Sequence, residues 1–408
     1  MTATDRAESR LFRELSPEQS VTLVAAWVLL LFVGAYLITP ASILPLIIAD
    51  LAISEATAAA LVSMPQVTAT VIGLPVGIYL DRVKTNAVVP VAAIILFLGS
   101  TGDWLAATEA NVALLIGSRL FAGVGMFMLW VVTVNVASSA FPPGRRATTT
   151  SVIISGYPAG YALGQLGTPR VANVVGWPGV FPVFGAAVLA VSVVFFVAAG
   201  RVARFDPSTS PPEVDDLKRV FVDRNVWSIV VVTLLGYSLY MLFNSWIPTY
   251  ITRRFGVSLA TSGSFVALFP AIGILARTAG GWLSDVWLGQ RRRPVFAVSF
   301  AGTSVLTVGI LYSTTIAVLV GILVLTGICI QLQIGLMYQS VREFVTPNVA
   351  GTAVSVASVA GWLGSFVAPV VAGGLVAITG TYTALFGFAV GLGLLGVLTV
   401  WRMPESGG

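Results

Sequence analysis

The chain of 408 residues is 57% hydrophobic and only 10% charged, and its mean hydropathy is +0.93. A water-exposed surface needs more charge than this, so a soluble protein is excluded. There is no histidine and a single cysteine, Cys329, which excludes histidine-based catalysis, histidine-rich metal sites and an intrachain disulfide. We therefore expect no cofactor, no metal site and no catalytic residue.

Twelve apolar stretches are each long enough to cross a bilayer, because a spanning helix needs about 20 apolar residues to cover a hydrocarbon core of about 30 Å. They cover residues 21–47, 56–80, 86–107, 111–140, 149–172, 178–200, 225–251, 258–285, 294–313, 315–340, 348–378 and 381–402. The first stretch is too long for a signal peptide and lacks a cleavage pattern, so we expect no leader to be removed. The prediction is an all-α membrane protein with twelve transmembrane helices.

The basic residues predict the orientation in the membrane. Of the 22 Lys and Arg residues, 17 fall on the side of the N-terminus, only Arg253 and Arg254 fall in loops on the other side, and Arg119, Arg170 and Arg277 lie inside spans. By the positive-inside rule, both termini are cytoplasmic. We expect a multi-pass protein of the cell membrane that contacts lipid, binds no nucleic acid and works as a monomer.

The most polar internal stretch divides the chain into two similar halves. We predict a cytoplasmic segment at 1–20, a six-helix bundle at 21–200, a cytoplasmic linker at 201–224, a second six-helix bundle at 225–402 and a tail at 403–408. Gly77 and Asp81 recur as Gly281 and Asp285, and four further Gly, Pro and Thr positions repeat at the same offset. Because the offset spans six helices, the halves form parallel repeats with the same orientation.

The segments Gly77-Ile78-Tyr79-Leu80-Asp81-Arg82 and Gly281-Trp282-Leu283-Ser284-Asp285 resemble the two loop signatures of the major facilitator superfamily. The segment Arg119-Leu120-Phe121-Ala122-Gly123-Val124-Gly125 is similar to its RxxxGxG pattern. This resemblance covers the whole chain and implies the major facilitator fold. It also implies that Gly77, Asp81, Arg82, Gly281 and Asp285 form a conformational latch, in which Asp81 holds the first half against the start of span eleven. The alternative is a solvated turn.

Two arginines inside predicted spans are candidate ligands. Arg277 lies eight residues before Asp285, about 12 Å from the end of its span, and Arg119 lies at a similar distance from the opposite end of its own. A charge at such depth costs at least about 2.5 kcal/mol and usually serves function. This interpretation places none of the 17 acidic residues near a span centre, so an anionic substrate would supply the opposite charge. The alternative is that either arginine snorkels or binds helix-end carbonyls.

Polar and aromatic residues at helical spacing predict a wet cavity between the halves. The candidate lining residues beside the two arginines are Tyr237, Tyr240, Asn244, Gln331, Tyr338, Ser358 and Trp362. For each of them the alternative is helix packing by a tolerated polar group. The glycines of spans five and eleven are interpreted as close-packing positions.

Arg277, just before Gly280-Gly281-Trp282-Leu283-Ser284-Asp285, resembles the anion-binding arginine of nitrate/nitrite porters and of oxalate/formate and monocarboxylate carriers. Nitrate porters pair it with an arginine in span two, where this chain has Gly73. A single strong basic group suits a monovalent anion or small carboxylate better than a dianion.

The resulting prediction is a secondary active or facilitative transporter that moves a small anion by alternating access. No GxxxxGK[ST] nucleotide-binding sequence is present, so the energy would come from a gradient. Anion exchange, uniport and symport remain open. The alternative is an exporter of amphipathic or drug-like compounds of the same superfamily, whereas an enzyme or receptor is disfavoured by the absence of a nucleophile–base pair.

Overall fold

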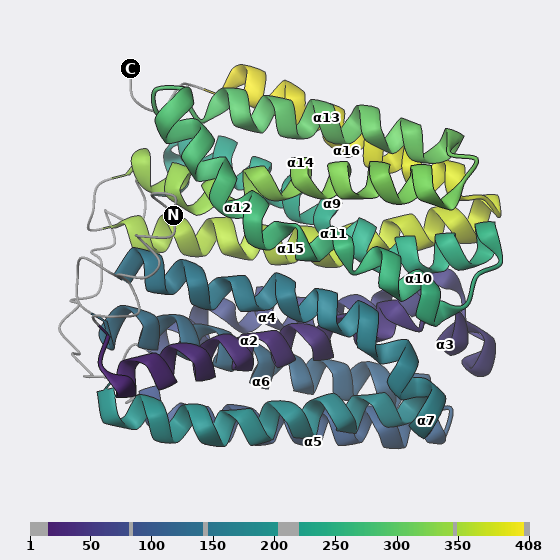
Figure 1. The fold of residues 1–408 in the computed structure, drawn as a ribbon, viewed down its shortest axis with the longest axis horizontal. Helices are drawn as coiled ribbons and strands as arrows, with labels where there is room; N and C mark the ends of the chain where they lie inside the picture. Colours follow the sequence, from purple (N-terminus) through teal and green to yellow (C-terminus); the bar gives the residue numbers. More distant parts are fainter. Residues whose placement is uncertain (1–14, 81–84, 142–145, 203–219, 346–348, 404–408) are drawn as a thin grey trace, which may run out of the picture.

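The structure is a computed structural model that describes residues 15–80, 85–141, 146–202, 220–345 and 349–403. The described residues form long helices and contain no strand (Figure 1). The first half contains α2 (Pro17–Ser42), α3 (Leu44–Leu51), α4 (Glu55–Leu80), α5 (Thr85–Thr108), α6 (Val112–Ser139) and α7 (Arg146–Val202). The second half contains α9 (Arg224–Phe255), α10 (Leu259–Val266), α11 (Leu268–Ala271), α12 (Gly273–Trp282), the π-helix η2 (Leu283–Trp287), α13 (Arg293–Tyr312), α14 (Ile316–Glu343), α15 (Ala350–Thr379) and α16 (Tyr382–Arg402).

The number of crossings follows from the lengths of these helices. Eleven stretches of the described chain are apolar and long enough to cross a membrane, and the longest of them, Thr149–Val202, has 54 residues. That is about 80 Å at 1.5 Å per residue, more than twice a hydrocarbon core. The stretch turns back at Gly176, where φ is +75° and ψ is 161°, a conformation that favours glycine. Spans five and six are therefore the two arms of α7, and the twelve predicted crossings are confirmed.

The helices gather into two groups that follow the order of the chain. In Figure 1 the purple-to-teal helices α2–α7 lie together, and the green-to-yellow helices α9–α16 lie beside them. Helices α2, α4 and α7 of the first half contact α9, α15 and α10–α12 of the second. Helix α2 begins and α16 ends at one end of the bundle, which we call the near end, and the opposite end is the far end. The bounds predicted for the two bundles and the linker stay a proposal.

Glycines let helices of one half approach to backbone contact. A Cβ atom added at Gly156 or Gly160 of α7 would collide with carbonyl oxygens of Trp27 and Leu31 in α2. The same holds in the second half for Gly364 of α15, whose added Cβ would meet the carbonyl oxygen of Leu234 in α9. The structure thus confirms close packing as the role of these glycines in spans five and eleven.

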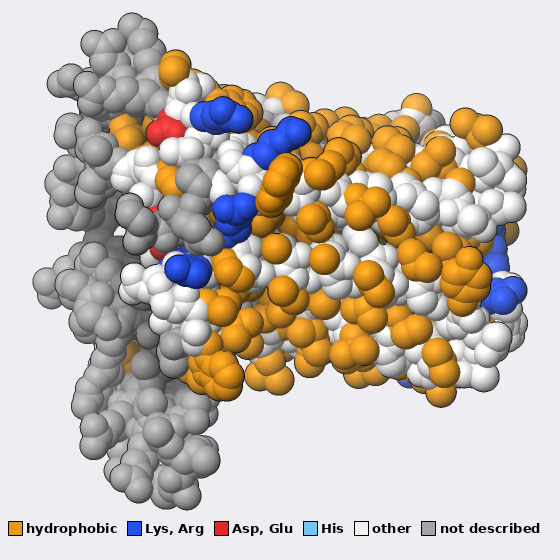
Figure 2. All heavy atoms as spheres, turned by 90° about the horizontal axis from the view of Figure 1, so that it is seen from above, with side chains coloured by type: hydrophobic (Ala, Val, Ile, Leu, Met, Phe, Trp, Pro, Cys, Tyr) orange, Lys and Arg blue, Asp and Glu red, His pale blue; other side chains and the backbone are white. Residues whose placement is uncertain are grey.

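The outer surface is apolar along the middle of the bundle. Figure 2 shows hydrophobic side chains over the length of the visible face, with Lys and Arg side chains toward its two ends. Large apolar side chains are exposed there, including Val71 and Leu275, which are 70% and 69% exposed. Trp282, Trp287 and Trp401 are exposed close to the near end, where amphipathic rings suit a headgroup layer. This surface is that of a multi-pass membrane protein.

Candidate functional site

Arg277 faces the boundary between the two halves from a broken span. The predicted span 258–285 forms four short elements, α10, α11, α12 and η2, and Pro270 lies at the break before α12. The Nε atom of Arg277 donates to Oε1 of Gln331 at 2.7 Å, and its guanidinium lies 5.5 Å from the centre of the Tyr240 ring. No other hydrogen bond or ion pair of Arg277 exists within the described residues. Its two Nη groups are therefore available to donate hydrogen bonds to a ligand.

The packing of α12 on α14 explains why Gln331 lies beside Arg277. A Cβ atom at Gly335 would collide with the backbone carbonyl of Arg277, and one at Gly280 with the carbonyl of Leu332. A Cβ atom at Gly273 would collide with the amide group of Gln331 itself. These glycines bring the two helices to backbone contact, and the side chain of Gln331 fills the space that Gly273 leaves.

An aromatic cluster adjoins the arginine and joins the two halves. Tyr240 of α9 stacks on Tyr161 of α7, with ring centres 5.6 Å apart, and on Phe269 of α11 at 5.9 Å. Tyr157 of α7 lies 5.2 Å from Tyr161 and 6.4 Å from Trp362 of α15. Edge and stacked arrangements at these separations are favourable. The cluster therefore lies between the halves beside the Arg277 guanidinium.

Several polar atoms of this region are buried and make no hydrogen bond to the part of the chain that the structure describes. They are the hydroxyl oxygens of Tyr157 and Tyr240 and the side-chain oxygen of Asn244. A buried polar group without a partner is costly, by about 1–3 kcal/mol. Such atoms are suited to meeting a ligand or water that enters between the halves.

The structure brings together only some of the residues predicted as ligands. Arg277 contacts both Tyr240 and Gln331, and the hydroxyl groups of Tyr237 and Tyr338 lie 3.2 Å apart. Trp362 is part of the aromatic cluster. Asn244 donates one N–H to the carbonyl of Tyr240, and Ser358 donates its hydroxyl to the carbonyl of Val354 in its own helix.

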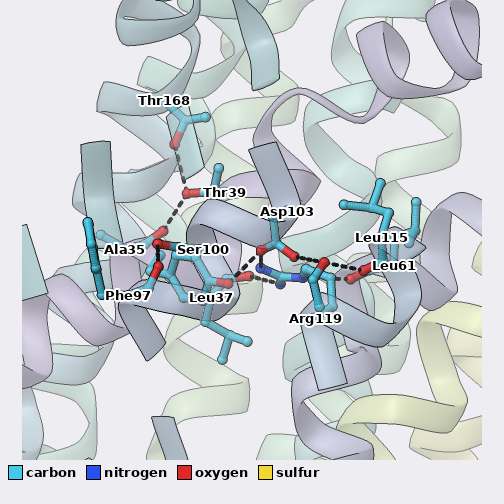
Figure 3. A network of polar contacts seen from close by, with 12 residues as sticks. Ala35, Leu37, Thr39, Leu61, Phe97, Ser100, Asp103, Leu115, Arg119 and Thr168 are labelled. Carbon is cyan, nitrogen blue, oxygen red and sulfur yellow. Dashed lines mark hydrogen bonds and ion pairs between the residues drawn. The ribbon is translucent and has the colours of Figure 1, made fainter. Parts of the chain in front are cut away.

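Arg119 belongs to a different environment, a buried polar network within the first half (Figure 3). Nη1 of Arg119 lies 3.6 Å from Oδ2 of Asp103, and both side chains are fully buried. Asp103 also accepts hydrogen bonds from the hydroxyl groups of Tyr36 and Ser118, each at 2.6 Å. The prediction that a buried arginine here has no protein carboxylate is wrong for Arg119. Asp103 lies only four residues from the end of the predicted span 86–107, but in α5 it is buried inside the bundle at the depth of Arg119.

The backbone completes the network around Arg119. Its Nε and Nη2 atoms donate to the carbonyl oxygens of Leu61 at 3.2 Å and of Leu37 at 3.3 Å. The residue four positions after Leu61 is Pro65, which has no N–H to offer that carbonyl. The guanidinium also lies 5.1 Å from the centre of the Tyr36 ring. Arg119 thus ties α2, α4 and α5 to α6, and the structure does not bring it to Arg277.

At the far end, an ion pair and a hydrogen bond join the two halves. Arg253 of α9 pairs with Glu55 of α4 at 3.3 Å, and Arg170 of α7 donates to Ser264 of α10 at 2.8 Å. A Cβ atom at Gly263 would collide with the carbonyl of Gln165 in α7. The halves are therefore in contact at this end.

Of the predicted latch residues, Asp285 is held within the second half. Arg292 bonds Asp285 and donates to Ser284 at 2.8 Å and to Glu343 at 2.9 Å. Burial alone lowers the pKa of Arg292, but its hydrogen bonds to Glu343 and Asp285 outweigh burial and raise it. An added Cβ at Gly281 would meet no atom within 4 Å.

The other half of the predicted latch is not described. Asp81 and Arg82 lie outside the described residues, and of Gly77 the structure describes only its place in α4. The latch therefore stays a prediction.

Four residues of the aromatic cluster were not predicted. They are Tyr157, Tyr161, Phe269 and Trp130, whose ring centre lies 5.1 Å from that of Tyr157. Tyr157 and Tyr161 are spaced i, i+4 in span five, the same signal that selected Tyr237 and Tyr240. Because this span is rich in glycine and proline, the sequence predicts a packing surface there and not a part of the cavity.

Two parallel groups of six crossings with polar and aromatic residues between them define a multi-pass membrane transporter. The chain belongs to the Major Facilitator Superfamily, because the sequence model of that family matches residues 24–291.

Similar proteins agree with this assignment. The probable nitrate/nitrite transporter NarK2 of Mycobacterium tuberculosis is 28% identical over 79% of this chain and 81% of its own length. The nitrite extrusion protein of Bacillus subtilis is 22% identical, with 90% of this chain and 88% of its own length covered. In fold, the chain resembles a bacterial homologue of the human lysosomal transporter Spinster, with a TM-score of 0.76, 18% identity and 95% of both chains covered.

Proposed function

We propose that this protein carries a small monovalent anion across the membrane by alternating access, with Arg277 as the principal ligand and no chemical step. One observation carries the proposal. Arg277 lies beside a cluster that joins the halves, and within the described residues no carboxylate pairs with it. An arginine cannot neutralise itself by losing a proton, so the cargo supplies the balancing charge.

The names of the relatives support an anion as cargo, since NarK2 is a probable nitrate/nitrite transporter and the Bacillus protein is a nitrite extrusion protein. The alternative, an exporter of amphipathic compounds, would use the same aromatic cluster. A guanidinium beside those rings repels cationic cargo, and the described residues hold no acid there to offset it.

The charge pattern supports an orientation with both termini in the cytoplasm of the cell, which makes the far end the outer end. The contacts at the far end would then close the site to the outside, and the cargo would leave or enter from the cytoplasm. We propose that the monomer performs this cycle.

Uptake by the purified protein in liposomes tests the proposal. Labelled nitrate, nitrite, formate, lactate and oxalate are each offered to the unmodified protein, Arg277→Ala, Arg277→Lys and the control Arg201→Ala, whose side chain is exposed at the near end. We expect the Arg277→Ala variant to lose uptake of every transported anion and the control to keep it. Full uptake by Arg277→Ala would refute an anion site at this residue.

A further inference from the structure

Both polar atoms of the Gln331 side chain make hydrogen bonds within the protein. Its Oε1 atom accepts from Nε of Arg277 at 2.7 Å, and its Nε2 atom donates to the carbonyl of Pro270 at 3.3 Å. Gln331 is fully buried. Because both polar atoms are bonded within the protein and the side chain is buried, Gln331 supports Arg277 in this structure, although it was predicted as a direct ligand of the cargo.

We propose that Gln331 is a positioning and specificity residue for Arg277, an inference that rests on the anion site proposed above. A guanidinium can bind a two-oxygen anion through its Nε and Nη2 edge or through its Nη1 and Nη2 edge. Because Gln331 occupies Nε, only the edge formed by Nη1 and Nη2 remains. Both Nη groups lack a hydrogen-bond partner among the described residues.

Gln331 also fixes the direction in which the Nη1 and Nη2 edge of Arg277 points. Pro270 and Arg277 lie on the two sides of the break between α11 and α12, so Gln331 joins both from α14. The Tyr240 ring lies on the guanidinium at 5.5 Å and limits its tilt. Three separate helices thus define the plane in which an anion meets the two Nη groups.

A fixed fork of two parallel N–H donors selects the shape of the cargo. It matches a planar anion with two coplanar oxygens, such as a carboxylate, nitrate or nitrite. A spherical halide must accept both N–H bonds on one atom, which bends them away from linear and weakens them. The class assigned to the site is therefore a planar monovalent oxyanion, in preference to a halide of the same charge.

The test compares Gln331→Met and Gln331→Glu with the matched control Gln333→Met. Gln333 lies on the same helix, its buried amide lies against Gly236 of α9, and it makes no hydrogen bond to Arg277. Uptake of labelled nitrate and formate into liposomes, and its competition by bromide, give KM, Vmax and a nitrate-to-bromide preference for each variant. Size-exclusion chromatography selects folded protein.

For Gln331→Met we expect a KM for nitrate and formate about tenfold higher, because one hydrogen bond to a charged group that orients the fork is lost. The nitrate-to-bromide preference should fall by a similar factor while Vmax changes less than twofold. Gln331→Glu places a carboxylate on Arg277 and should abolish uptake in a folded protein. The control should match the unmodified protein.

The inference is overturned if Gln331→Met keeps both the KM and the preference, or if Gln331→Glu transports normally. Should Gln331→Met fail to fold, Gln331→Glu decides alone, since it keeps the volume and the acceptor. If Arg277→Ala loses uptake but both Gln331 variants keep the KM and the preference, the role proposed for Gln331 is refuted and the anion site at Arg277 is not. Full uptake in Arg277→Ala would refute the anion site itself.

Discussion

Replacing Asp103 tests whether the buried network of the first half stabilises the fold or serves the cargo. The carboxylate accepts two hydrogen bonds at 2.6 Å and lies 3.6 Å from Arg119, and neither charged side chain is exposed. In Asp103→Ala the guanidinium stays buried without a counter-ion. Breaking a buried pair from one side typically costs about 3–5 kcal/mol.

The milder variant Asp103→Asn keeps one acceptor for a hydroxyl group but loses the charge. Because hydrogen bonds to charged groups contribute about 1.5–3 kcal/mol and neutral ones about 1 kcal/mol, its cost should be about 2–3 kcal/mol. Arg119→Gln should cost a similar amount. The double variant should lose less than the sum of the two single losses, because the unpaired charge that each single variant leaves is absent.

Thermal unfolding in detergent, followed by size-exclusion chromatography, gives the midpoint for each variant. With an unfolding entropy of about 2.1 cal/mol/K per residue over 408 residues, about 1 °C is lost per kcal/mol, so Asp103→Ala should lower the midpoint by roughly 3–6 °C. Asp50→Asn is the control, since Asp50 is exposed and accepts one bond from Trp177 at 2.8 Å. Its midpoint should change little.

Transport kinetics below the unfolding temperature complete the experiment. If the network serves the fold, Asp103→Asn and Arg119→Gln keep the KM for nitrate while their midpoints fall. Unchanged midpoints with a raised KM would refute the reasoning. They would support Arg119 as a ligand of the cargo, as the sequence predicts.

Two further predictions concern the boundary between the halves. In a Cys329→Ser background, Gly263→Leu should weaken crosslinking between cysteines placed at Glu55 and Arg253, because the new side chain collides with backbone of the other half. Gly374→Leu, with no atom within 4 Å of its Cβ position, should leave crosslinking intact, and equal crosslinking in both variants would contradict the prediction. Tyr240→Phe removes a hydroxyl with no partner among the described residues. It should keep the unfolding midpoint but raise the KM for the cargo about tenfold, and an unchanged KM would show that the hydroxyl does not contact it.

The twelve crossings were predictable because the bilayer imposes a length of about 20 apolar residues on each of them. The break at Pro270 and the turn at Gly176 also lie at residues whose backbone preferences are local. The aromatic cluster was only half predictable. Tyr240 and Trp362 were selected by helical spacing, but their stacking on Tyr161 and Tyr157 depends on how the two halves meet, which local patterns do not encode.

The sequence does contain an indication that Asp103 and Arg119 lie close together. Helices α5 and α6 are consecutive, antiparallel and joined by a short turn near Asn111, so residues at equal distances from that turn lie at the same depth. Asp103 and Arg119 are both eight positions from Asn111. Comparing depths across a helical hairpin, instead of counting distance to a span end, would have paired them.

Arg119 and Arg277 differ in whether a carboxylate of the described residues balances their charge. Arg119 is paired with Asp103 and fully buried, so we expect it to hold helices together and not to meet a cargo. Arg277 is partly exposed and bonded to a neutral amide, which orients the guanidinium without cancelling its charge. A carboxylate in place of Gln331 would hold the side chain more strongly, but it would remove the attraction for an anion. An amide meets both requirements, and we therefore propose that the identity of residue 331 decides whether Arg277 binds the cargo or only packs.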